Sequence, residues 1–166
     1  FLLDWSDVGE CHENDGVHRT SGRIYRITYG KQKPKKRNLA ENSSGELANF
    51  LQSPNKKIVR HSARLLQERA SNPGINAKTI DSLRKTKNQG KPEARLQALW
   101  ALHRTENLKE KELIEMVNDK DEHIRIWAMK LLVDGGKASE IASKAILERA
   151  ASEKSALVRL HFASVL

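Results

Sequence analysis

DEHIRIWAMKLL at residues 121–132 decides the fold that we predict, because three other stretches of the chain repeat its pattern. They are KKIVRHSARLL at 56–66, KPEARLQALWAL at 91–102 and SALVRLHFASVL at 155–166. In each stretch an arginine follows a small or branched apolar residue. An alanine or a phenylalanine lies three residues after the arginine, and an apolar doublet follows further on. The aligned arginines are Arg60, Arg95, Arg125 and Arg159, which are 35, 30 and 34 residues apart. Helical pairs that repeat at this period stack on one another, because only neighbouring pairs can cover the apolar face of each pair.

Turn and capping signals divide this region into helices. Ser43 with Glu46 predicts a capping box for a first helix that ends near Gln52. Ser53-Pro54 predicts a cap and a first-turn proline for the second helix. Further helix starts are predicted at Asn76, Pro92, Asn107 with Glu110, Asp121, Ala138 and Ser155. Residues 44–166 are therefore predicted to be mainly α, and they resemble HEAT or armadillo-like repeats that build an α-solenoid.

The first 30 residues follow a different pattern. Residues 1–5 and 22–29 are rich in β-branched and aromatic residues, which predicts two strands on either side of a polar loop. Two strands alone are marginal in water, so we expect strands that precede residue 1 to complete this sheet. Phe1 in place of a methionine, and an apolar pattern that continues to Leu166, predict that the sequence is cut at both ends.

The formal charge of +9 is unevenly distributed along the chain. Residues 1–30 carry three arginines and five acidic residues, a net of −2, while residues 31–166 carry 27 basic and 16 acidic residues, a net of +11. The densest basic run is KQKPKKR at 31–37. This run favours a linker over residues 31–43, which the repulsion between its positive charges keeps extended. The alternative is that the run binds phosphates or an anionic membrane surface. The chain has no run of 18 apolar residues, so no membrane-spanning helix is predicted in this segment.

The polar loop between the two predicted strands holds the candidate site residues. They are Asp7, Glu10, Cys11, His12, Asp15, His18 and Arg19. Cys11, His12 and His18 are ligands that suit zinc, copper or an axial haem position, whereas the carboxylates suit a harder cation such as calcium. Neither spacing matches a known metal motif. The pattern favours a purely structural loop, in which Cys11 packs as a small apolar side chain and the acids form hydrogen bonds with Arg19 or Arg23. Contact with a cofactor or substrate is the second interpretation, and metal binding is the third.

Three sets of residues in the helical region also have two interpretations each. Trp100 and Trp127 lie in corresponding second-helix segments, where they favour the core over a binding platform. The four aligned arginines favour hydrogen bonds between repeats, to acids such as Asp121, over a ladder that recognises phosphates. The helical histidines favour surface or groove positions over metal binding, and they are His61, His103, His123 and His161.

The residues around the loop resemble a known family. DWSD at 4–7, GECH at 9–12 and GRIYRITYG at 22–30, with Arg19 before the last run, are similar to a signature of the membrane-bound dehydrogenases of planctomycetes and verrucomicrobia, also called haem-binding proteins. In that family the signature lies near the end of a β-propeller related to glucose/sorbosone dehydrogenases. HEAT-like repeats follow, and a cytochrome c-type domain with a Cys-x-x-Cys-His motif often comes last. The resemblance implies that residues 1–30 are the C-terminal strands of a truncated propeller and that 44–166 are truncated helical repeats.

The same resemblance implies a function for the parent protein. It would be a modular periplasmic, or otherwise extracytoplasmic, oxidoreductase that oxidises a sugar or an alcohol and passes electrons to a haem domain, with haem c or a quinone as cofactor. Cys11 lies outside any Cys-x-x-Cys-His motif, so no cofactor, catalytic residue or activity is placed on this chain itself. The helical repeats would scaffold or dock the other domains of the same protein, or protein partners. Two alternatives follow from the basic helical region, a HEAT-repeat module that binds nucleic acid and a plain protein-interaction scaffold.

Overall fold

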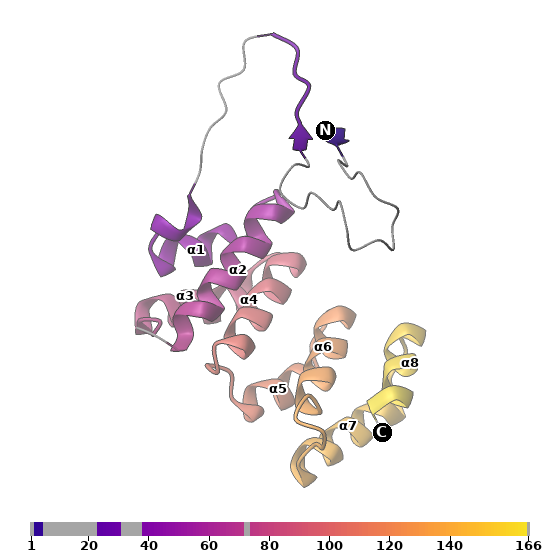
Figure 1. Cartoon of the computed structure of the whole chain (residues 1–166). Coiled ribbons are helices and arrows are strands. Elements are labelled where there is room, and N and C mark those ends of the chain that lie inside the picture. Colours follow the sequence, from indigo (N-terminus) through magenta and orange to yellow (C-terminus); the bar gives the residue numbers. More distant parts are fainter. Residues whose placement is uncertain (1, 5–22, 31–37, 72–73, 166) are drawn as a thin grey trace, which may run out of the picture. The chain divides into compact units, whose positions relative to one another are not determined.

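Figure 1 shows the computed structural model of this chain, which describes residues 2–4, 23–30, 38–71 and 74–165. Its contacts divide it into two units, Phe1–Arg37 and Asn38–Leu166. The prediction of a mainly α chain with a short β piece is confirmed, since strands occur only in the first unit among these residues. The helices of the second unit are α1 (Ser44–Phe50), α2 (Lys56–Ser71), α3 (Ala77–Gln89), α4 (Pro92–Arg104), α5 (Glu110–Met116), α6 (Glu122–Leu132), α7 (Glu140–Ser152) and α8 (Ala156–Val165), after a 3-10 turn at Leu39–Glu41.

The first unit contains two short antiparallel strands, β1 (Leu2–Asp4) and β2 (Arg23–Tyr25). Leu2 is paired with Tyr25, and Leu3 is paired with Ile24. These four apolar side chains are all exposed, and Leu3 and Ile24 keep 79% and 73% of their surface. The two strands therefore form a sheet whose apolar side chains lack a packed layer among the residues that the structure describes.

The second unit is built from helices that pack in consecutive pairs. Within the pairs, α1 contacts α2, α3 contacts α4, α5 contacts α6 and α7 contacts α8. Between the pairs, the second helices α2, α4, α6 and α8 each contact the next one, so that they succeed one another through the unit (Figure 1). Among the first helices, α1 contacts α3 and α5 contacts α7. All successive second helices are thus neighbours, and among the first helices this holds for α1 with α3 and for α5 with α7.

The apolar core runs through these pairs as two clusters that share α4. Leu99 of α4 belongs to the cluster of α5 to α8, while Ala98, Ala101 and Leu102 of the same helix belong to the cluster of α1 to α4. Leu108, in the α4–α5 connection, packs against both clusters. Full burial of a leucine-sized side chain stabilises a fold by about 1.5–3 kcal/mol, so both faces of α4 contribute to holding neighbouring pairs together.

The predicted helix starts were mostly right. Ser43 Oγ accepts a hydrogen bond from Glu46 N at 3.3 Å and Ser43 N donates to Glu46 Oε2 at 2.8 Å, which confirms the capping box of α1. Asn76 and Asp121 cap α3 and α6 through their side-chain oxygens, also as predicted. Gly90 ends α3, where a Cβ would lie 2.7 Å from the carbonyl oxygen of Thr86. Only glycine therefore fits this tight connection to Pro92.

Two predicted caps were wrong. The cap of α2 is Asn55, whose Oδ1 accepts from Lys57 N at 3.0 Å, so the helix begins later than Ser53-Pro54 predicts. At α5 the cap is Lys109, whose backbone N donates to Glu112 Oε2 at 3.1 Å. Asn107, the predicted cap, instead donates through its side chain to the carbonyl oxygen of Thr105 at 2.7 Å. At α2 a second side-chain acceptor, Asn55, takes the capping position. At α5 the side chain of Glu112 holds the backbone N of Lys109 from within the helix, so no side-chain acceptor at the capping position is used.

The cap of α2 also changes the alignment of the repeats. Counted from the caps Asn55, Lys91, Asp121 and Ser155, the fourth residue is an arginine in α4, α6 and α8 but a valine in α2. The seventh residue is almost completely buried in all four helices, and these residues are Ser62, Ala98, Ala128 and Phe162. Arg60 therefore does not occupy the arginine position, and the predicted alignment of the first repeat is wrong by one residue. The third residue after the cap is apolar in all four helices, and these residues are Ile58, Ala94, Ile124 and Val158. The apolar patterns therefore agree with the caps, and the predicted alignment was shifted because Arg60 was matched to the other arginines.

Candidate functional site

Each second helix turns one face to solvent, and the cap-based register shows which residues of these faces correspond. The sixth residue after the cap is half-buried in every second helix, and these residues are His61, Gln97, Trp127 and His161. The ninth residue is half-buried or exposed, and these residues are Arg64, Trp100, Lys130 and Ser164. We call these eight residues the second-helix row. Since α2, α4, α6 and α8 are successive neighbours, an elongated ligand that crosses them would contact this row.

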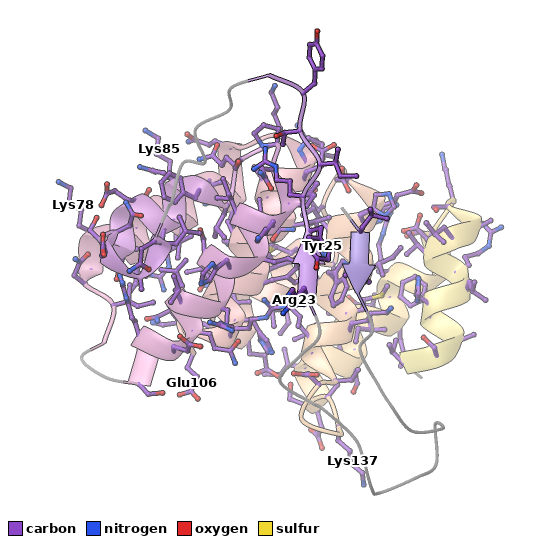
Figure 2. All side chains as sticks on the ribbon, turned by 45° about the horizontal axis from the view of Figure 1, so that its top comes forward. Arg23, Tyr25, Lys78, Lys85, Glu106 and Lys137 are labelled. Atoms are coloured by element: carbon purple, nitrogen blue, oxygen red, sulfur yellow. The ribbon has the colours of Figure 1, made fainter. Side chains whose placement is uncertain are left out.

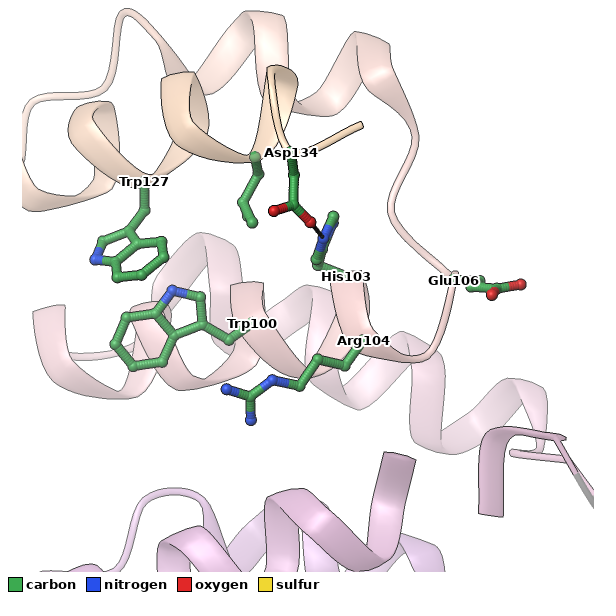
Figure 3. A pocket seen from close by; sticks show the side chains of 7 residues that line it. Trp100, His103, Arg104, Glu106, Trp127 and Asp134 are labelled. Atoms are coloured by element: carbon green, nitrogen blue, oxygen red, sulfur yellow. Dashed lines mark hydrogen bonds and ion pairs between the residues drawn. The ribbon is translucent and has the colours of Figure 1, made fainter. Parts of the chain in front are cut away.

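The centre of the second-helix row is a pocket between α4 and α6 with a volume of about 620 Å³ (Figure 3). Its lining residues are Trp100, His103, Arg104, Glu106, Trp127, Leu131 and Asp134. Pockets of this size that combine apolar walls with a few polar groups are the usual binding sites for small molecules and side chains. It is the best candidate site in the part of the chain that the structure describes.

Trp100 and Trp127 form the apolar wall of this pocket. Their ring centroids are 4.8 Å apart and the ring planes meet at 76°, an edge-to-face geometry that stabilises such pairs. Lys130 Nζ lies 5.3 Å from the centroid of Trp127, within the range of a cation–π contact. Both tryptophans are half-buried and line the pocket. Trp127 also packs against the core cluster of α5 to α8, so the prediction that they belong to the core is only partly right.

Trp100 carries an unused hydrogen-bond donor. Its Nε1 is buried and has no acceptor among the described residues. Figure 3 shows this nitrogen on the side of the ring that is turned to Trp127. A buried donor without an acceptor costs about 1–3 kcal/mol, and such groups occur at sites where a ligand supplies the acceptor.

The polar end of the pocket is formed by His103 and Asp134. His103 Nε2 lies 3.0 Å from Asp134 Oδ2, which joins α4 to the residues that follow α6. The histidine side chain is 32% exposed and the aspartate side chain 65%. A surface pair of this kind adds little stability, so both groups stay available to a ligand in the pocket.

A second hollow lies on α2, and cationic side chains dominate it. Lys57, Arg60, His61 and Arg64 line it. Lys57, Arg60 and Arg64 are exposed, and Arg64 Nε lies 3.1 Å from Glu68 Oε1 one helical turn later. Residues that are three or four positions apart share one helix face, so these four side chains form one basic surface, which we call the α2 basic face.

Two of the aligned arginines hold neighbouring pairs together. Arg95 Nη1 donates to Asp119 Oδ1 at 3.0 Å while its Nη2 bonds the other carboxylate oxygen, and its Nε donates to the carbonyl oxygen of Lys87 at 2.8 Å. Arg125 binds both carboxylate oxygens of Glu153, at 2.8 and 2.9 Å. The prediction of hydrogen bonds between repeats is thus confirmed for Arg95 and Arg125, although the acids are Asp119 and Glu153 rather than Asp121.

These ion pairs shift the pKa values of their members. Burial alone would raise the pKa of Glu153, but hydrogen bonds from Ser155 N and Arg125 and the charges of Arg125 and Arg149 outweigh it and lower the pKa to about 2. The pKa of Asp119 is also lowered, because the hydrogen bonds from Arg95 and from the backbone of Asp121 outweigh its burial. The hydrogen bond with Asp119 raises the pKa of Arg95. Both pairs are therefore fully charged at neutral pH.

Arg159 and Arg60 differ from these two arginines. Arg159 Nη1 donates to the carbonyl oxygens of Glu153 and Lys154, at 3.2 and 2.8 Å. Arg60 is exposed on the α2 basic face. The α3–α4 connection at 88–91 reads NQGK, without a carboxylate that could match Asp119 or Glu153. The aligned arginines therefore do not form one ladder for phosphates.

The candidate site residues that the sequence offers lie outside the described part of the chain. They are Asp7, Glu10, Cys11, His12, Asp15, His18 and Arg19, and the three interpretations of their loop stay predictions. Within the described ranges, no group of three or more histidine, cysteine, aspartate or glutamate side chains is placed to hold a metal ion. No helix in these ranges is long and apolar enough to cross a membrane.

The pocket itself was missed by the sequence interpretation. The sequence interpretation treated Trp100 and Trp127 as residues of corresponding segments. Trp100 is the ninth residue after its cap, whereas Trp127 is the sixth after its own. The contact between the two rings therefore joins different positions of the two helices. The polar flanks, Arg104 and Lys130, follow each tryptophan by four and three residues on the same helix face. The positions of the two tryptophans in the sequence do not reveal this contact, because it joins different positions of the two helices.

Comparisons with known proteins add no relative: no family model, curated protein or solved structure matches this chain.

Proposed function

We propose that residues 38–165 form a HEAT- or armadillo-like helical-repeat module that binds a protein partner, and that the Trp100–Trp127 pocket seats an apolar side chain of that partner. The contacts between equivalent helices of successive pairs support the repeat architecture. The observation that carries the binding role is the pocket between α4 and α6, where two half-buried tryptophans share an apolar wall and Trp100 Nε1 lacks an acceptor.

The chemistry of the pocket suits a peptide segment. Half-buried tryptophans are the residues that most often dominate the binding energy of protein interfaces, because they offer a large rigid apolar surface together with a polar handle. The indole N–H of Trp100 is buried beside Trp127, so a backbone carbonyl of the bound segment would reach it only when the Trp127 ring moves aside. Arg104 and Lys130 at the flanks would meet carbonyls or carboxylates of the same segment.

For the parent protein we keep the proposal that the resemblance of residues 4–30 implies. It is an extracytoplasmic dehydrogenase of the sugar or alcohol type, in which this module scaffolds or docks another domain, such as a haem domain that receives electrons. The support for this part is the resemblance alone, and the pocket supports only the docking role.

The test is a selection of peptides on the complete chain. A display library of random short linear peptides is panned against the immobilised protein, and the binders are measured by titration calorimetry. We expect the selected peptides to share an apolar or aromatic anchor residue. Trp100→Ala and Trp127→Leu should weaken their binding by roughly thirtyfold, the effect of losing a dominant interface residue.

The matched control removes an exposed apolar side chain from another helix. Leu147→Ala on α7 truncates a side chain that is 55% exposed and should leave the affinity unchanged. Circular dichroism must show native helix content for every variant. Peptides without a shared anchor, or peptides that bind the tryptophan variants as well as the wild type, would refute the proposed function.

A further inference from the structure

We infer that the partner segment is acidic on one side of its anchor: while an apolar side chain fills the Trp100–Trp127 pocket, carboxylates of the same segment bind the α2 basic face. This inference rests on the proposed function, because it needs the pocket as the anchor site. It adds the chemistry and the spacing of the segment that the module recognises.

The first support is the composition of the α2 basic face. Lys57, Arg60, His61 and Arg64 line its hollow without a carboxylate among the lining residues. The neighbouring Glu68 is engaged by Arg64 in a pair whose side chains are 67% and 55% exposed, and such pairs are weak. Bidentate binding of a carboxylate by a guanidinium is stronger and more specific. Arg60 and Arg64 are therefore placed to take acidic side chains.

The second support is that the α2 basic face and the pocket lie on one line of equivalent positions. The sixth residue after the cap is His61 in α2, Gln97 in α4 and Trp127 in α6. The ninth residue after the cap is Arg64 in α2, Trp100 in α4 and Lys130 in α6. Helices α2 and α4 are in contact, and so are α4 and α6. A segment that leaves the pocket across α4 towards α2 therefore meets Arg64 and then Arg60.

Arg104 extends this positive surface from the pocket. It follows Trp100 by four residues on α4 and is exposed. In the view of Figure 3 its guanidinium lies on the side of Trp100 that is turned away from Trp127. The acids that line the pocket, Glu106 and Asp134, come from the residues beyond the C-terminal ends of α4 and α6. The charges thus separate into a basic side towards α2 and an acidic end near His103.

The spacing of the recognised residues follows from the helix geometry. Packed helices lie about 8–10 Å apart, so the distance from the α2 basic face to a pocket between α4 and α6 is about 12–15 Å. An extended peptide covers about 3.3 Å per residue, and carboxylates about four residues from the anchor would reach Arg60 and Arg64.

A peptide fits these observations better than a nucleic acid. A single strand would need successive aromatic faces on which bases stack and a basic groove along its whole backbone. Here the two indole rings meet edge to face, and Asp134 and Glu106 at the end of the pocket would repel a continuous row of phosphates. A peptide can carry carboxylates on one side of the anchor and neutral residues on the other.

The test uses synthetic probes of one length that differ in a single feature. The acidic probe carries two adjacent glutamates about four residues from a phenylalanine, the neutral probe has glutamines in their place, and oligo-deoxythymidine is the nucleic-acid probe. Binding to the complete chain is measured by titration calorimetry at low salt. We expect the acidic probe to bind at least roughly tenfold more tightly than the neutral probe, as charge-assisted hydrogen bonds predict.

The variants separate local recognition from net charge. Arg60→Gln with Arg64→Gln should abolish the advantage of the acidic probe. The matched control is Lys78→Gln with Lys85→Gln, which removes two charges from exposed lysines of α3 that point into solvent (Figure 2) and should preserve the advantage. Neutral-probe binding should be the same in both variants.

Each outcome decides between the claims. If the acidic and neutral probes bind equally tightly, the inference is refuted while the pocket function stands. If neither probe binds and peptide selection yields no shared anchor, the proposed function is refuted and the inference with it. Tighter binding of oligo-deoxythymidine than of the acidic probe, with loss in Arg60→Gln/Arg64→Gln, would replace the acidic peptide by nucleic acid.

Discussion

Glu153 links the last two helical pairs through its hydrogen bonds. Its side chain is 1% exposed, and it accepts hydrogen bonds from Arg125, Arg149 and the backbone N of Ser155. A buried carboxylate without such partners would be very costly, whereas one with three donors is well solvated by the protein. The pair of Glu153 with Arg125 therefore fixes the position of α6 relative to the α7–α8 turn.

Replacing Glu153 tests this role through stability and its pH dependence. Glu153→Gln leaves the buried Arg125 without its charge partner, and we expect the free energy of unfolding at pH 7 to fall by about 3 kcal/mol. Because the pKa of Glu153 in the folded chain is lowered from 4.5 to about 2, its contribution is complete above about pH 4.5 and is lost as the pH falls towards 2. The stabilities of wild type and variant, measured by urea denaturation, should therefore converge with decreasing pH.

The control for this measurement lies on the same helix as Arg149. Glu148→Gln on α7 removes a carboxylate that is 68% exposed and lies 4.0 Å from Lys144, and it should change stability by less than about 0.5 kcal/mol. An unchanged difference between wild type and Glu153→Gln from pH 7 to pH 3 would show that the charge of Glu153 does not stabilise the fold.

At the scale of the helices, the start of α2 decides which residues face which neighbour. Asn55 lies as far before the apolar pattern as Lys91, Asp121 and Ser155 do in the other second helices, but the arginine of α2 comes five residues after its cap instead of four. Val59 takes the position that Arg95 and Arg125 occupy in α4 and α6, where it is buried, and Arg60 is left on the surface. The displacement of this arginine by one position thus places it on the α2 basic face.

The two candidate caps of α2 can be separated by mutation. Asn55→Ala should reduce the free energy of unfolding by about 1 kcal/mol, since the backbone N–H groups of Lys57 and Ile58 lose their acceptor. Ser53→Ala should cost less, because its Oγ accepts only from Asn55 N, outside the helix. Chemical denaturation of both variants gives the comparison, and a larger effect of Ser53→Ala would restore the cap that the sequence predicts.

Local signals explain how much could be predicted from the sequence. The helices, their pairing and the caps at Ser43, Asn76 and Asp121 follow from patterns within a few residues. The acids that meet Arg95 and Arg125 are 24 and 28 residues away, and no local pattern marks Asp119 over Asp121 as the partner. The Trp100–Trp127 pocket likewise depends on two helices that touch at different positions of the repeat, so it required the three-dimensional register.

At the scale of the whole molecule, the charge of +9 is not concentrated in one large basic surface among the described residues. Arg95 and Arg125 are neutralised by buried acids, and Lys87 is buried with its Nζ 3.2 Å from Glu112 Oε1. The cations that stay exposed lie on several helices, and they include the α2 basic face, Arg104 of α4, Arg159 of α8 and lysines such as Lys78 and Lys85 of α3. Net charge therefore overstates the attraction that this chain exerts on a polyanion.

Binding to duplex DNA provides the corresponding test. We expect weak association at low salt that disappears near physiological ionic strength, because few phosphates are contacted and each contact releases counterions. Fluorescence anisotropy of a labelled duplex across a salt series measures this dependence. Tight binding that persists at physiological salt would show that the basic helical region is a nucleic-acid site.

The buried ion pairs join residues of neighbouring helical pairs that are close in the sequence. This short separation has a consequence for how the chain folds during translation. Asp119 follows Arg95 by 24 residues, and Glu153 follows Arg125 by 28. At synthesis rates of about 5–20 residues per second, each arginine waits only a few seconds for its acid to leave the ribosome. Each new pair can then dock on the pair made before it, so the buried arginines are neutralised in the order of translation and little apolar surface is exposed at any one time.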